Sequence, residues 1–389
     1  MPDNSLNLAG KARPTKSVAG NRARRFQHFI LLHRIPVFDH NPSSFILQLA
    51  RSIISAFLIA ILAACNTSPP PPYQQQSYVF GTLVEISIAG ESDERAAKLA
   101  AQVMREFERL HHKLHAWKPG ELSALNASFA KQQPPVPVAV DTEIALILQD
   151  AGRLSAQSGG LFNPAIGKLV KLWGFHADDF QPALPDAGEI AKLAAANPQM
   201  RDLVIDGGKI HSKNPAVQLD LGGYAKGYAL DLAAAYLRKE GVNSALVNIG
   251  GNVIAIGKNG ARAWRVGIQH PRKPAAIATL ELQDGEAIGT SGDYQRYFEV
   301  AGKRYCHLID PRSGYPVNGV QAVTVVMPPA ANAGTLSDVA SKPLFVAGVK
   351  DWQDAARTMR VELAMLIDSD NNVHLTEAMK KRLVVLESR

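Results

Sequence analysis

The 389-residue sequence predicts an α+β fold. Segments with helical periodicity and segments typical of hairpins follow one another without the strict strand–helix alternation of a parallel βαβ sheet. Between residues 244 and 328, short apolar runs are broken by Gly, Pro and Asn, which is typical of several strands joined by turns. No internal repeat is evident, and this mixture of helices and hairpins favours α+β.

The first 64 residues account for most of the positive charge. They hold eight Lys or Arg and two Asp, a surplus of +6 within the net charge of +7. The rest of the chain is therefore nearly neutral. Its composition gives no reason to expect a nucleic-acid partner.

A lipoprotein signal is predicted at Ser52–Cys65. Its apolar run follows Arg51 and ends in Leu-Ala-Ala-Cys, which resembles a bacterial lipobox. An uncleaved membrane anchor is the alternative, but the run is shorter than the roughly 20 residues that a spanning helix needs. We therefore expect residues 1–64 to be a signal segment, Cys65 to carry lipid, and residues 65–77 to form a Pro/Gln-rich linker. The expected location is the periplasmic side of a bacterial inner membrane, reached through this lipid anchor.

The first elements after the linker are expected to be a strand and a helix. Tyr78–Ile88 has the composition of a strand, and an amphipathic helix is expected from Ser92 to about His115. His111 and His115 share one face of this helix at the spacing of a metal-binding pair. Because no acidic third ligand is nearby, a solvated or structural face is favoured.

Caps and turn residues define the later elements. Asp141 and Gly159 bound a helix, and Asp206-Gly207-Gly208 is typical of a tight hairpin turn. We expect helices over 141–157, 224–239 and 332–346, the last irregular at Pro343, and short strands within 203–221 and 244–328.

The window Gly289–Val317 carries the candidate chemistry. Its Thr290-Ser291-Gly292-Asp293 run is a turn signal, typical of backbone N–H groups that line an anion-binding concavity. Two apolar and aromatic runs around Ala301-Gly302-Lys303 predict a hairpin, which puts His307 near a strand end. Histidine titrates near neutral pH and can take a proton from a hydroxyl. A hydrogen bond inside the sheet is the alternative role for this histidine.

This window resembles the signature of the ApbE family, the FAD:protein FMN transferases, which an older label ties to thiamine biosynthesis lipoproteins. Members carry a similar TSGDY block and a Tyr-x-His-x-x-Asp-Pro block, here beginning at Thr290 and Tyr305. Further similar blocks follow in the family's order: FGTLVEISI from Phe80, HAWKPGELSALN from His115, GGLFNPAIGKLVKLWGF from Gly159, LDLGGYAKGYALD from Leu219, VNIGGNV from Val247 and SDVASKPLFVAG from Ser337. The resemblance implies a T-fold-like domain of mixed or antiparallel sheets with helices over residues 78–389.

The resemblance also implies roles for single residues. His307 is implied to be catalytic and to take the proton of an acceptor hydroxyl. Asn163 stands where the family often has aspartate, so it keeps an acceptor but loses a charge. Cys306 stands where the family tends to have a small residue, so a packing thiol is favoured over a nucleophile. The residues implied to contact FAD are Phe80, Trp117, Leu161, Phe162, Asn163, Asp220, Lys226 and Leu308.

The implied magnesium site departs from the family pattern. The family implies a metal held by a backbone carbonyl near Gly223, by Asp338 and by a Thr four residues later, but this chain has Lys342 there. Residues four apart on a helix lie on the same face, so the two side chains meet. A protonated ammonium does not ligate Mg²⁺ and repels it at short range. Either the lysine pairs with Asp338 and replaces part of the metal's charge, or it swings out while water completes the coordination.

The implied activity is transfer of FMN from FAD to a Thr or Ser hydroxyl of a protein, with release of AMP. The family's acceptors include subunits of the sodium-pumping NADH:quinone reductase and of Rnf-type complexes. Two alternatives stay open. One is a hydrolase that converts FAD to FMN and AMP, and the other is an FAD-binding lipoprotein without catalysis, because Lys342 replaces the usual metal ligand.

Overall fold

The computed structural model describes residues 70–131, 136–177, 179 and 181–386. These residues belong to one unit, Pro69–Arg389. The predicted signal segment 1–64 and the predicted lipidation site Cys65 lie outside the described residues. Within the described part, none of the helices is both long and apolar enough to cross a bilayer.

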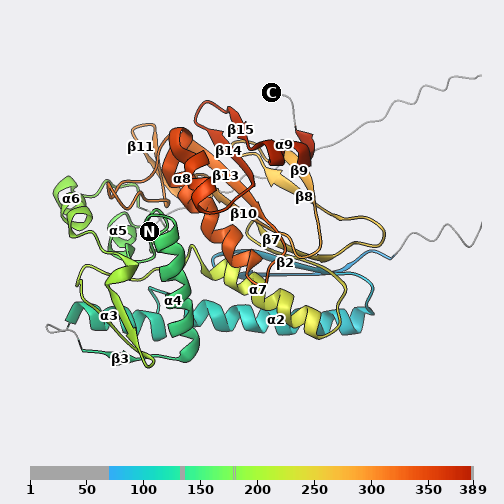
Figure 1. Cartoon of the computed structure of the whole chain (residues 1–389), viewed down its shortest axis with the longest axis horizontal. Coiled ribbons are helices and arrows are strands. Elements are labelled where there is room, and N and C mark those ends of the chain that lie inside the picture. Colours follow the sequence, from blue (N-terminus) through green and yellow to red (C-terminus); the bar gives the residue numbers. More distant parts are fainter. Residues whose placement is uncertain (1–69, 132–135, 178, 180, 387–389) are drawn as a thin grey trace, which may run out of the picture. The chain divides into compact units, whose positions relative to one another are not determined.

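An eight-stranded sheet lies at the centre of this unit (Figure 1), and all its neighbouring strands pair antiparallel. In spatial order the strands are β1 (Tyr73–Val79), β2 (Thr82–Ile88), β6 (Ser244–Ile249), β7 (Asn252–Gly257), β10 (Ala287–Gly292), β13 (Val320–Met327), β14 (Leu363–Asp368) and β15 (Val373–Leu375). The middle strands come from segments far apart in the sequence, since β7 pairs with β10 and β10 with β13.

Both faces of this sheet are covered. In β7, Ile254 and Ile256 belong to one hydrophobic core, whereas Val253 and Ala255 belong to another. Successive side chains of a strand point to opposite faces, so this alternation means that each face packs on its own layer. Consistent with this, β13 is buried along its whole length.

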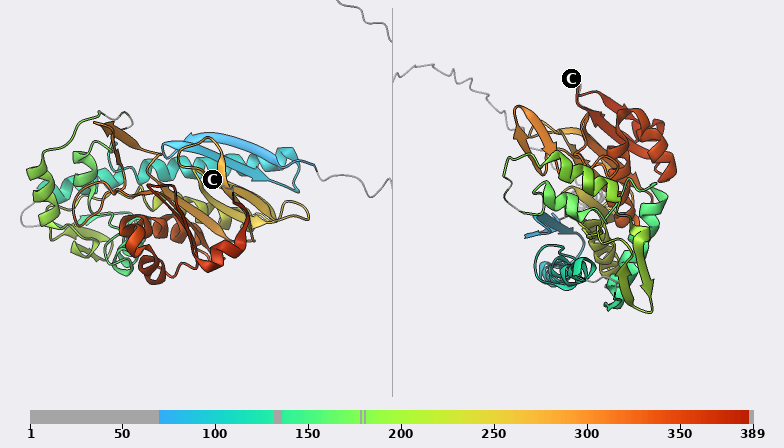
Figure 2. Two further views of the ribbon diagram at one scale, coloured as in Figure 1. Left: turned by 90° about the horizontal axis from the view of Figure 1, so that it is seen from above. Right: turned by 90° about the vertical axis from the view of Figure 1, so that its left-hand side faces the viewer.

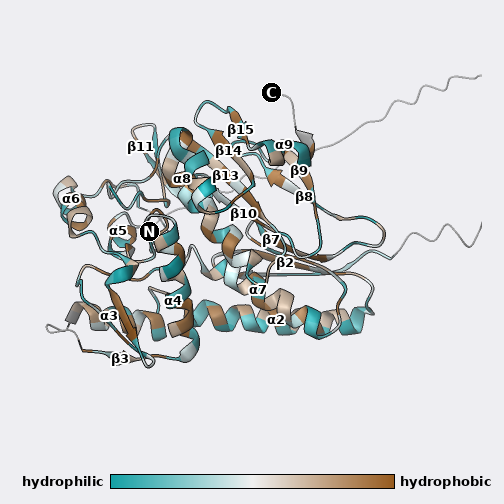
Figure 3. Cartoon of the chain, viewed as in Figure 1, coloured by the Kyte–Doolittle hydropathy of each residue, from teal (hydrophilic) through white to brown (hydrophobic). Residues whose placement is uncertain are grey.

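Three long helices cover one face: α2 (Asp93–Lys113), α7 (Ala225–Lys239) and α8 (Ala333–Thr358). α2 buries residues at helical spacing, including Leu99 and Phe107, and exposes polar residues between them, as the alternating colours in Figure 3 show. The views in Figure 2 place the blue β1–β2 hairpin directly beside this helix. α8 packs on α7, β10 and β13.

A smaller antiparallel sheet covers the other face. It consists of β8 (Trp264–Gln269), β9 (Ala276–Leu282) and β16 (Leu383–Leu386), and α9 (Glu377–Arg382) lies next to it. The indole of Trp264 is buried here, and its Nε1 donates to the carbonyl of Ile256 at 3.1 Å. The polar end of this side chain is thereby satisfied inside an apolar core.

Shorter elements gather at one end of the large sheet, at the left of Figure 1. These elements are α3 (Glu121–Lys131), β3 (Val138–Ala139), α4 (Thr142–Gln157), α5 (Gly167–Leu172), α6 (Ala187–Ala196), the 3₁₀ turn η1 (Met200–Asp202), β4 (Leu203–Asp206), β5 (Lys209–Ser212), β11 (Tyr297–Val300) and β12 (Lys303–Cys306). The side chain of Asp141 caps α4, because it accepts a hydrogen bond from the Glu143 backbone N–H at 2.7 Å.

Most of the predicted elements are confirmed. The helices expected over 92–115, 141–157 and 224–239 are α2, α4 and α7. Both expected hairpins form, with β4–β5 turning at Asp206-Gly207-Gly208 and β11–β12 turning at Ala301-Gly302. The strands predicted within 203–221 end at Ser212, however.

The single strand predicted over Tyr78–Ile88 is wrong. Phe80 and Gly81 have φ of 57° and 70°, and the chain reverses there into a hairpin. The expected linker is correspondingly shorter, because residues 73–77 lie in β1. Alternate side chains of this polar run are partly buried, which is the period of a strand with one covered face.

The turn predicted at Thr290-Ser291-Gly292-Asp293 is also wrong, because its first three residues lie in β10. The small residues serve a different purpose. A Cβ atom on Gly289 would lie 2.2 Å from the carbonyl oxygen of Ser337, and the hydroxyls of Ser291 and Ser341 are 2.8 Å apart. Small residues on this strand therefore let α8 approach the sheet directly.

The helix predicted over 332–346 is longer than expected. α8 continues to Thr358 with Pro343 inside it, and its backbone departs from helical geometry at Gly348, where φ is 74°. The proline therefore does not end the helix, and the glycine supplies the break.

Candidate functional site

The β11–β12 hairpin presents His307 directly after its second strand. An aromatic stack holds the hairpin in place, with the Phe298 and Trp173 ring centroids each 5.5 Å from that of Tyr305. The stack is anchored to the following loop, since Trp173 Nε1 donates to the Gly314 carbonyl at 2.8 Å. The histidine is thus fixed by packing on both sides of its strand.

The tautomer of the His307 side chain is set by the backbone of Arg296. The His307 Nδ1 lies 3.2 Å from the carbonyl oxygen of Arg296, which can only accept, so the proton of the neutral ring is on Nδ1 and the lone pair is on Nε2. Burial, and then the positive charges of Arg296 and Lys226, lower the pKa of His307 to about 3. The ring is therefore neutral near pH 7 before any anion binds.

Arg296 organises this histidine and was not singled out from the sequence. Its guanidinium Nη2 donates to the carbonyls of Phe175 and Ala177 at 3.0 and 2.8 Å. The Phe175 ring in turn lies edge-on to His307, with centroids 6.4 Å apart. Gly81, at the turn of the β1–β2 hairpin, also lies against this arginine. The only sequence signal was its position inside the TSGDYQR run.

Asp338 and Lys342 form a buried ion pair on α8. Lys342 Nζ donates to Asp338 Oδ1 and to the Asp338 carbonyl, both at 2.6 Å, and the exposed fractions of the two side chains are 14% and 1%. The other carboxylate oxygen, Oδ2, accepts from the Gly227 backbone at 2.9 Å.

Opposing effects set the charge of this pair. Burial alone would raise the pKa of Asp338, but the positive charges of Lys342 and Lys226 outweigh it, and that pKa is lowered. Burial lowers the pKa of Lys342 below its ordinary value, and the nearby Asp338 carboxylate offsets only part of this effect. Because the carboxylate is ionised at hydrogen-bond distance from Nζ, we assign the pair as ammonium and carboxylate.

The glycine-rich loop before α7 packs on this lysine. A Cβ on Gly223 would lie 2.7 Å from Lys342 Cε and 3.5 Å from the Phe162 ring, so a larger residue would displace the lysine side chain. The same loop holds Asp220, whose Oδ1 accepts from the Gly222 backbone at 2.8 Å. The strand expected before this helix is absent from the described residues, where Gln218 makes only an isolated bridge to Ile166.

The structure therefore brings together Gly223, Asp338 and Lys342, the three residues of the implied metal site. Lys226 lies in the first turn of α7, directly after the glycine-rich loop, and its Nζ lies 3.4 Å from the Gly222 carbonyl oxygen. Its charge contributes to the pKa shifts of both His307 and Asp338. A base and a group of cations thus share one site.

The other residues implied to contact FAD differ in their burial and in their hydrogen bonds. Phe162 is buried beside the glycine loop, and Leu161 next to it is partly buried. Leu308 is buried, and its carbonyl accepts from Val317 at 2.8 Å. The Asn163 side chain joins two segments, because its Nδ2 donates to the Pro198 carbonyl and its Oδ1 accepts from the Ala165 N–H.

Two aromatic residues among the implied contacts lie on neighbouring segments. Trp117 meets His176 edge-on with centroids 5.5 Å apart, and His176 Nδ1 is buried with no hydrogen-bond partner among the described residues. His176 follows Phe175, which connects this pair to His307. Phe80 packs on His111 with centroids 5.6 Å apart, so that histidine forms part of an aromatic contact. No group of three His, Cys, Asp or Glu within the described ranges is arranged to hold a metal.

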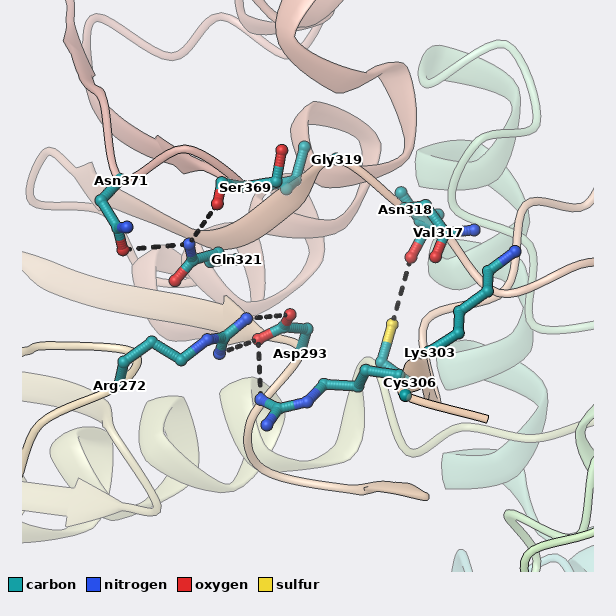
Figure 4. A pocket seen from close by; sticks show the side chains of 13 residues that line it. Arg272, Asp293, Lys303, Cys306, Val317, Asn318, Gly319, Gln321, Ser369 and Asn371 are labelled. Atoms are coloured by element: carbon teal, nitrogen blue, oxygen red, sulfur yellow. Dashed lines mark hydrogen bonds and ion pairs between the residues drawn. The ribbon is translucent and has the colours of Figure 1, made fainter. Parts of the chain in front are cut away.

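Cys306 lines a pocket of about 440 Å³ (Figure 4), whose lining includes neither His307 nor Lys342. In it, Arg272 pairs with Asp293 at 2.6 Å. The Cys306 thiol faces the Val317 carbonyl, and burial raises its pKa to about 12. A thiol so weakly acidic is a poor nucleophile, in agreement with the packing role expected for it.

The model of the ApbE family matches residues 80–367. The chain belongs to the ApbE family. It is 42% identical over 341 residues to an FAD:protein FMN transferase of Rhodobacter capsulatus, covering 88% of this chain and 63% of that protein. It is 32% identical to one of Klebsiella pneumoniae, covering 81% of this chain and 95% of that protein.

Two solved structures of ApbE proteins share this fold. The ApbE protein of Thermotoga maritima superposes with a TM-score of 0.71 at 29% identity, covering 80% of this chain and 99% of that one. The flavin transferase ApbE of Vibrio cholerae superposes with a TM-score of 0.68 at 26% identity, covering 80% of this chain and 100% of that one. The expected α+β, ApbE-type fold with antiparallel sheets is therefore confirmed.

Proposed function

We propose that this ApbE family member transfers FMN from FAD to a Thr or Ser hydroxyl of an acceptor protein and releases AMP. Relatives that it matches over most of its length bear the name FAD:protein FMN transferase. The observation that carries the proposal is the neutral His307 with a free Nε2 lone pair beside the cations of Lys226 and Lys342. Such a site offers a base for a hydroxyl and positive charge for a pyrophosphate.

In the proposed step, the acceptor hydroxyl oxygen attacks the FMN-side phosphorus of FAD. A new P–O bond forms as the bond from that phosphorus to the bridging oxygen breaks, and AMP leaves with the electron pair. The hydroxyl proton passes to Nε2 of His307. The products are the FMN phosphodiester of the protein and AMP, so no oxidant or reductant is needed.

Binding of FAD is proposed to use the residues around this centre. A flat isoalloxazine or adenine ring buries well against aromatic side chains, which favours Trp117, Phe80 and Phe162 as its neighbours. Asp220 lies on the loop before α7 and Lys226 lies in its first turn, where a helix N-terminus favours phosphate.

A magnesium ion does not fit the residues of this site as they stand. One Asp338 oxygen binds Lys342 Nζ and the other binds the Gly227 N–H. Gly223, the third implied contributor, packs on the lysine side chain. Mg²⁺ prefers an octahedron of oxygen ligands, and an ammonium cannot supply one. The proposed step therefore uses no metal.

The acceptor and the location are proposed from the sequence. Lipid on Cys65 would confine the enzyme to the periplasmic face of the inner membrane, where subunits of the sodium-pumping NADH:quinone reductase or of Rnf-type complexes would be its acceptors. Confinement to one surface raises the effective concentration of enzyme and acceptor.

The test is incubation of the full-length chain with FAD and a purified acceptor subunit, followed by mass spectrometry of the acceptor and chromatography of the nucleotides. We expect covalent FMN on one Thr or Ser and one AMP for each FMN attached. Free FMN and AMP with an unmodified acceptor would instead identify a hydrolase. FAD binding with no AMP at all would identify a binding protein.

A further inference from the structure

We infer that the ammonium of Lys342 is a built-in substitute for a divalent cation, so that the reaction runs on FAD alone without metal. This inference rests on the proposed function, because it assigns Lys342 to the FAD pyrophosphate. It makes Lys342 a further catalytic residue of this chain.

The first support is the rigid placement of the ammonium. Two of its three N–H donors are taken by the carboxylate and the carbonyl of Asp338, each at 2.6 Å. The third has no partner among the residues that the structure describes. Gly223 packs on the stem of the side chain, so the lysine cannot move toward the loop without displacing it.

The second support is the balance of charge. Lys342, Lys226 and Arg296 all act on the His307 ring, and Asp338 is the carboxylate that pairs with this group. Lys342 and Lys226 alone outnumber the Asp338 carboxylate with which they interact, so this group carries surplus positive charge. A pyrophosphate would supply the missing negative charge, and a further dication would add repulsion.

The third support is that both carboxylate oxygens of Asp338 already accept a hydrogen bond. Its Oδ1 is bound to Lys342 and its Oδ2 to the Gly227 N–H, which is itself fixed by the packing of α7 on α8. Gly227 has no space to move, because a Cβ there would lie 2.4 Å from the Gly334 carbonyl. A metal would have to displace the ammonium from a buried carboxylate, which is costly.

In the reaction, Lys342 would donate its third N–H to a pyrophosphate oxygen and stabilise the negative charge that gathers on AMP as it leaves. The lysine keeps its proton throughout, and the hydroxyl proton still goes to His307. A preorganised donor of this kind is worth about 100-fold to 1,000-fold in rate.

The first experiment measures AMP release and covalent FMN for the full-length chain, freed of metal, with FAD and an acceptor subunit in EDTA or in Mg²⁺. We expect wild-type rates that agree within about twofold. Lys342→Met should lower the rate about 100-fold in both buffers. Lys342→Thr should be as slow as Lys342→Met in EDTA, but its rate should recover in Mg²⁺. Lys350→Met, which changes an exposed lysine of the same helix, is the matched control.

A wild-type rate that falls tenfold or more in EDTA and returns with Mg²⁺ would overturn the inference. So would a Lys342→Met variant that melts at the wild-type temperature and keeps its full rate.

A second measurement tests the inference and does not depend on catalytic turnover. Mn²⁺ binding is followed by electron paramagnetic resonance in the presence of FAD. We expect no stoichiometric Mn²⁺ on the wild type and one equivalent on Lys342→Thr. One equivalent on the wild type would overturn the metal-free assignment even if no acceptor is ever modified. Failure of the proposed function alone would leave the Mn²⁺ pattern as expected but give no covalent FMN.

Discussion

At the scale of single residues, the site depends on a histidine that is kept neutral by burial and by its positively charged neighbours. Arg296 fixes the tautomer of His307 through its carbonyl and disfavours protonation through its guanidinium. When FAD binds, its pyrophosphate brings negative charge toward Lys226 and Lys342. The pKa of the histidine then rises toward the value of a useful base.

Replacement of His307 by Ala should lower the rate of FMN transfer about 100-fold to 10,000-fold, because the acceptor hydroxyl loses its base. FAD affinity, followed by quenching of flavin fluorescence, should change much less. His112→Ala is the control, since that histidine is exposed on α2. Transfer by His307→Ala at the wild-type rate would remove this histidine from the mechanism.

The lowered pKa of His307 also predicts a pH dependence of stability. The folded pKa is about 3 and the ordinary value is 6.5, so between these values the unfolded chain takes up a proton that the folded chain does not. The contribution is fully present above about pH 6.5 and is lost as the pH falls toward 3. Wild type should therefore lose more unfolding free energy than His307→Gln over this range in urea titrations. If the unfolding free energies of the two proteins changed in parallel with pH, the lowered pKa of His307 would be contradicted.

The sequence reveals the chemical residues of this site better than their supports. His307, Asp338 and Lys342 stand in motifs. The helical spacing of the last two predicts that their side chains meet, and of the two arrangements left open the structure shows the ion pair. Arg296 and His176 act through backbone carbonyls and burial, which depend on segments distant in the sequence. No local sequence pattern predicts such contacts.

At the scale of elements, the crossing of α7 and α8 positions the site. Gly227 and Gly334 let the two backbones meet, since a Cβ on either would lie within 2.6 Å of the carbonyl oxygen of the other. Asp231 then binds the start of α8, accepting from the Gly334 and Thr335 backbones at 2.7 and 2.8 Å. Close contact and a capping carboxylate together place Asp338 one turn further along.

The Gly227→Ala substitution should therefore destabilise the protein by about 1–3 kcal/mol and disturb the Asp338 carboxylate, because the new methyl group has no room. The matched control is Gly152→Ala in the interior of α4. There a Cβ would lie 4.0 Å from its nearest neighbour, Met200, so we expect a gain of about 0.4–1 kcal/mol. Chemical denaturation measures both. Equal effects of the two changes would mean that the helix crossing is not tight.

Elements with strong local signals are those that the sequence predicts. α2 and α4 have capping side chains and amphipathic periods, so their limits follow from short-range physics. β1 and the small residues of β10 do not, because a polar strand and a Thr-Ser-Gly strand gain their structure from pairing and from α8. Tertiary packing overrides composition at both places.

At the scale of the whole molecule, the site is assembled from three segments far apart in the chain. The loop at 220–227, the hairpin at 297–307 and α8 meet only because the large sheet and its helical layer are complete. A substitution that loosens this layer should therefore affect the base and the ion pair together.

The proposed lipid anchor gives a prediction for the complete protein. In a bacterial host fed labelled palmitate, the wild type should incorporate lipid and Cys65→Ser should not, because this change removes the one thiol at the predicted cleavage point. The variant should also have a larger mass than the processed wild type, since it keeps residues 1–64.

Cys306→Ser is the control, since these are the only two cysteines and Cys306 is buried in the folded part. It should incorporate lipid as the wild type does. A wild type that keeps residues 1–64 and carries no lipid would instead favour an uncleaved anchor formed by the apolar run before Cys65.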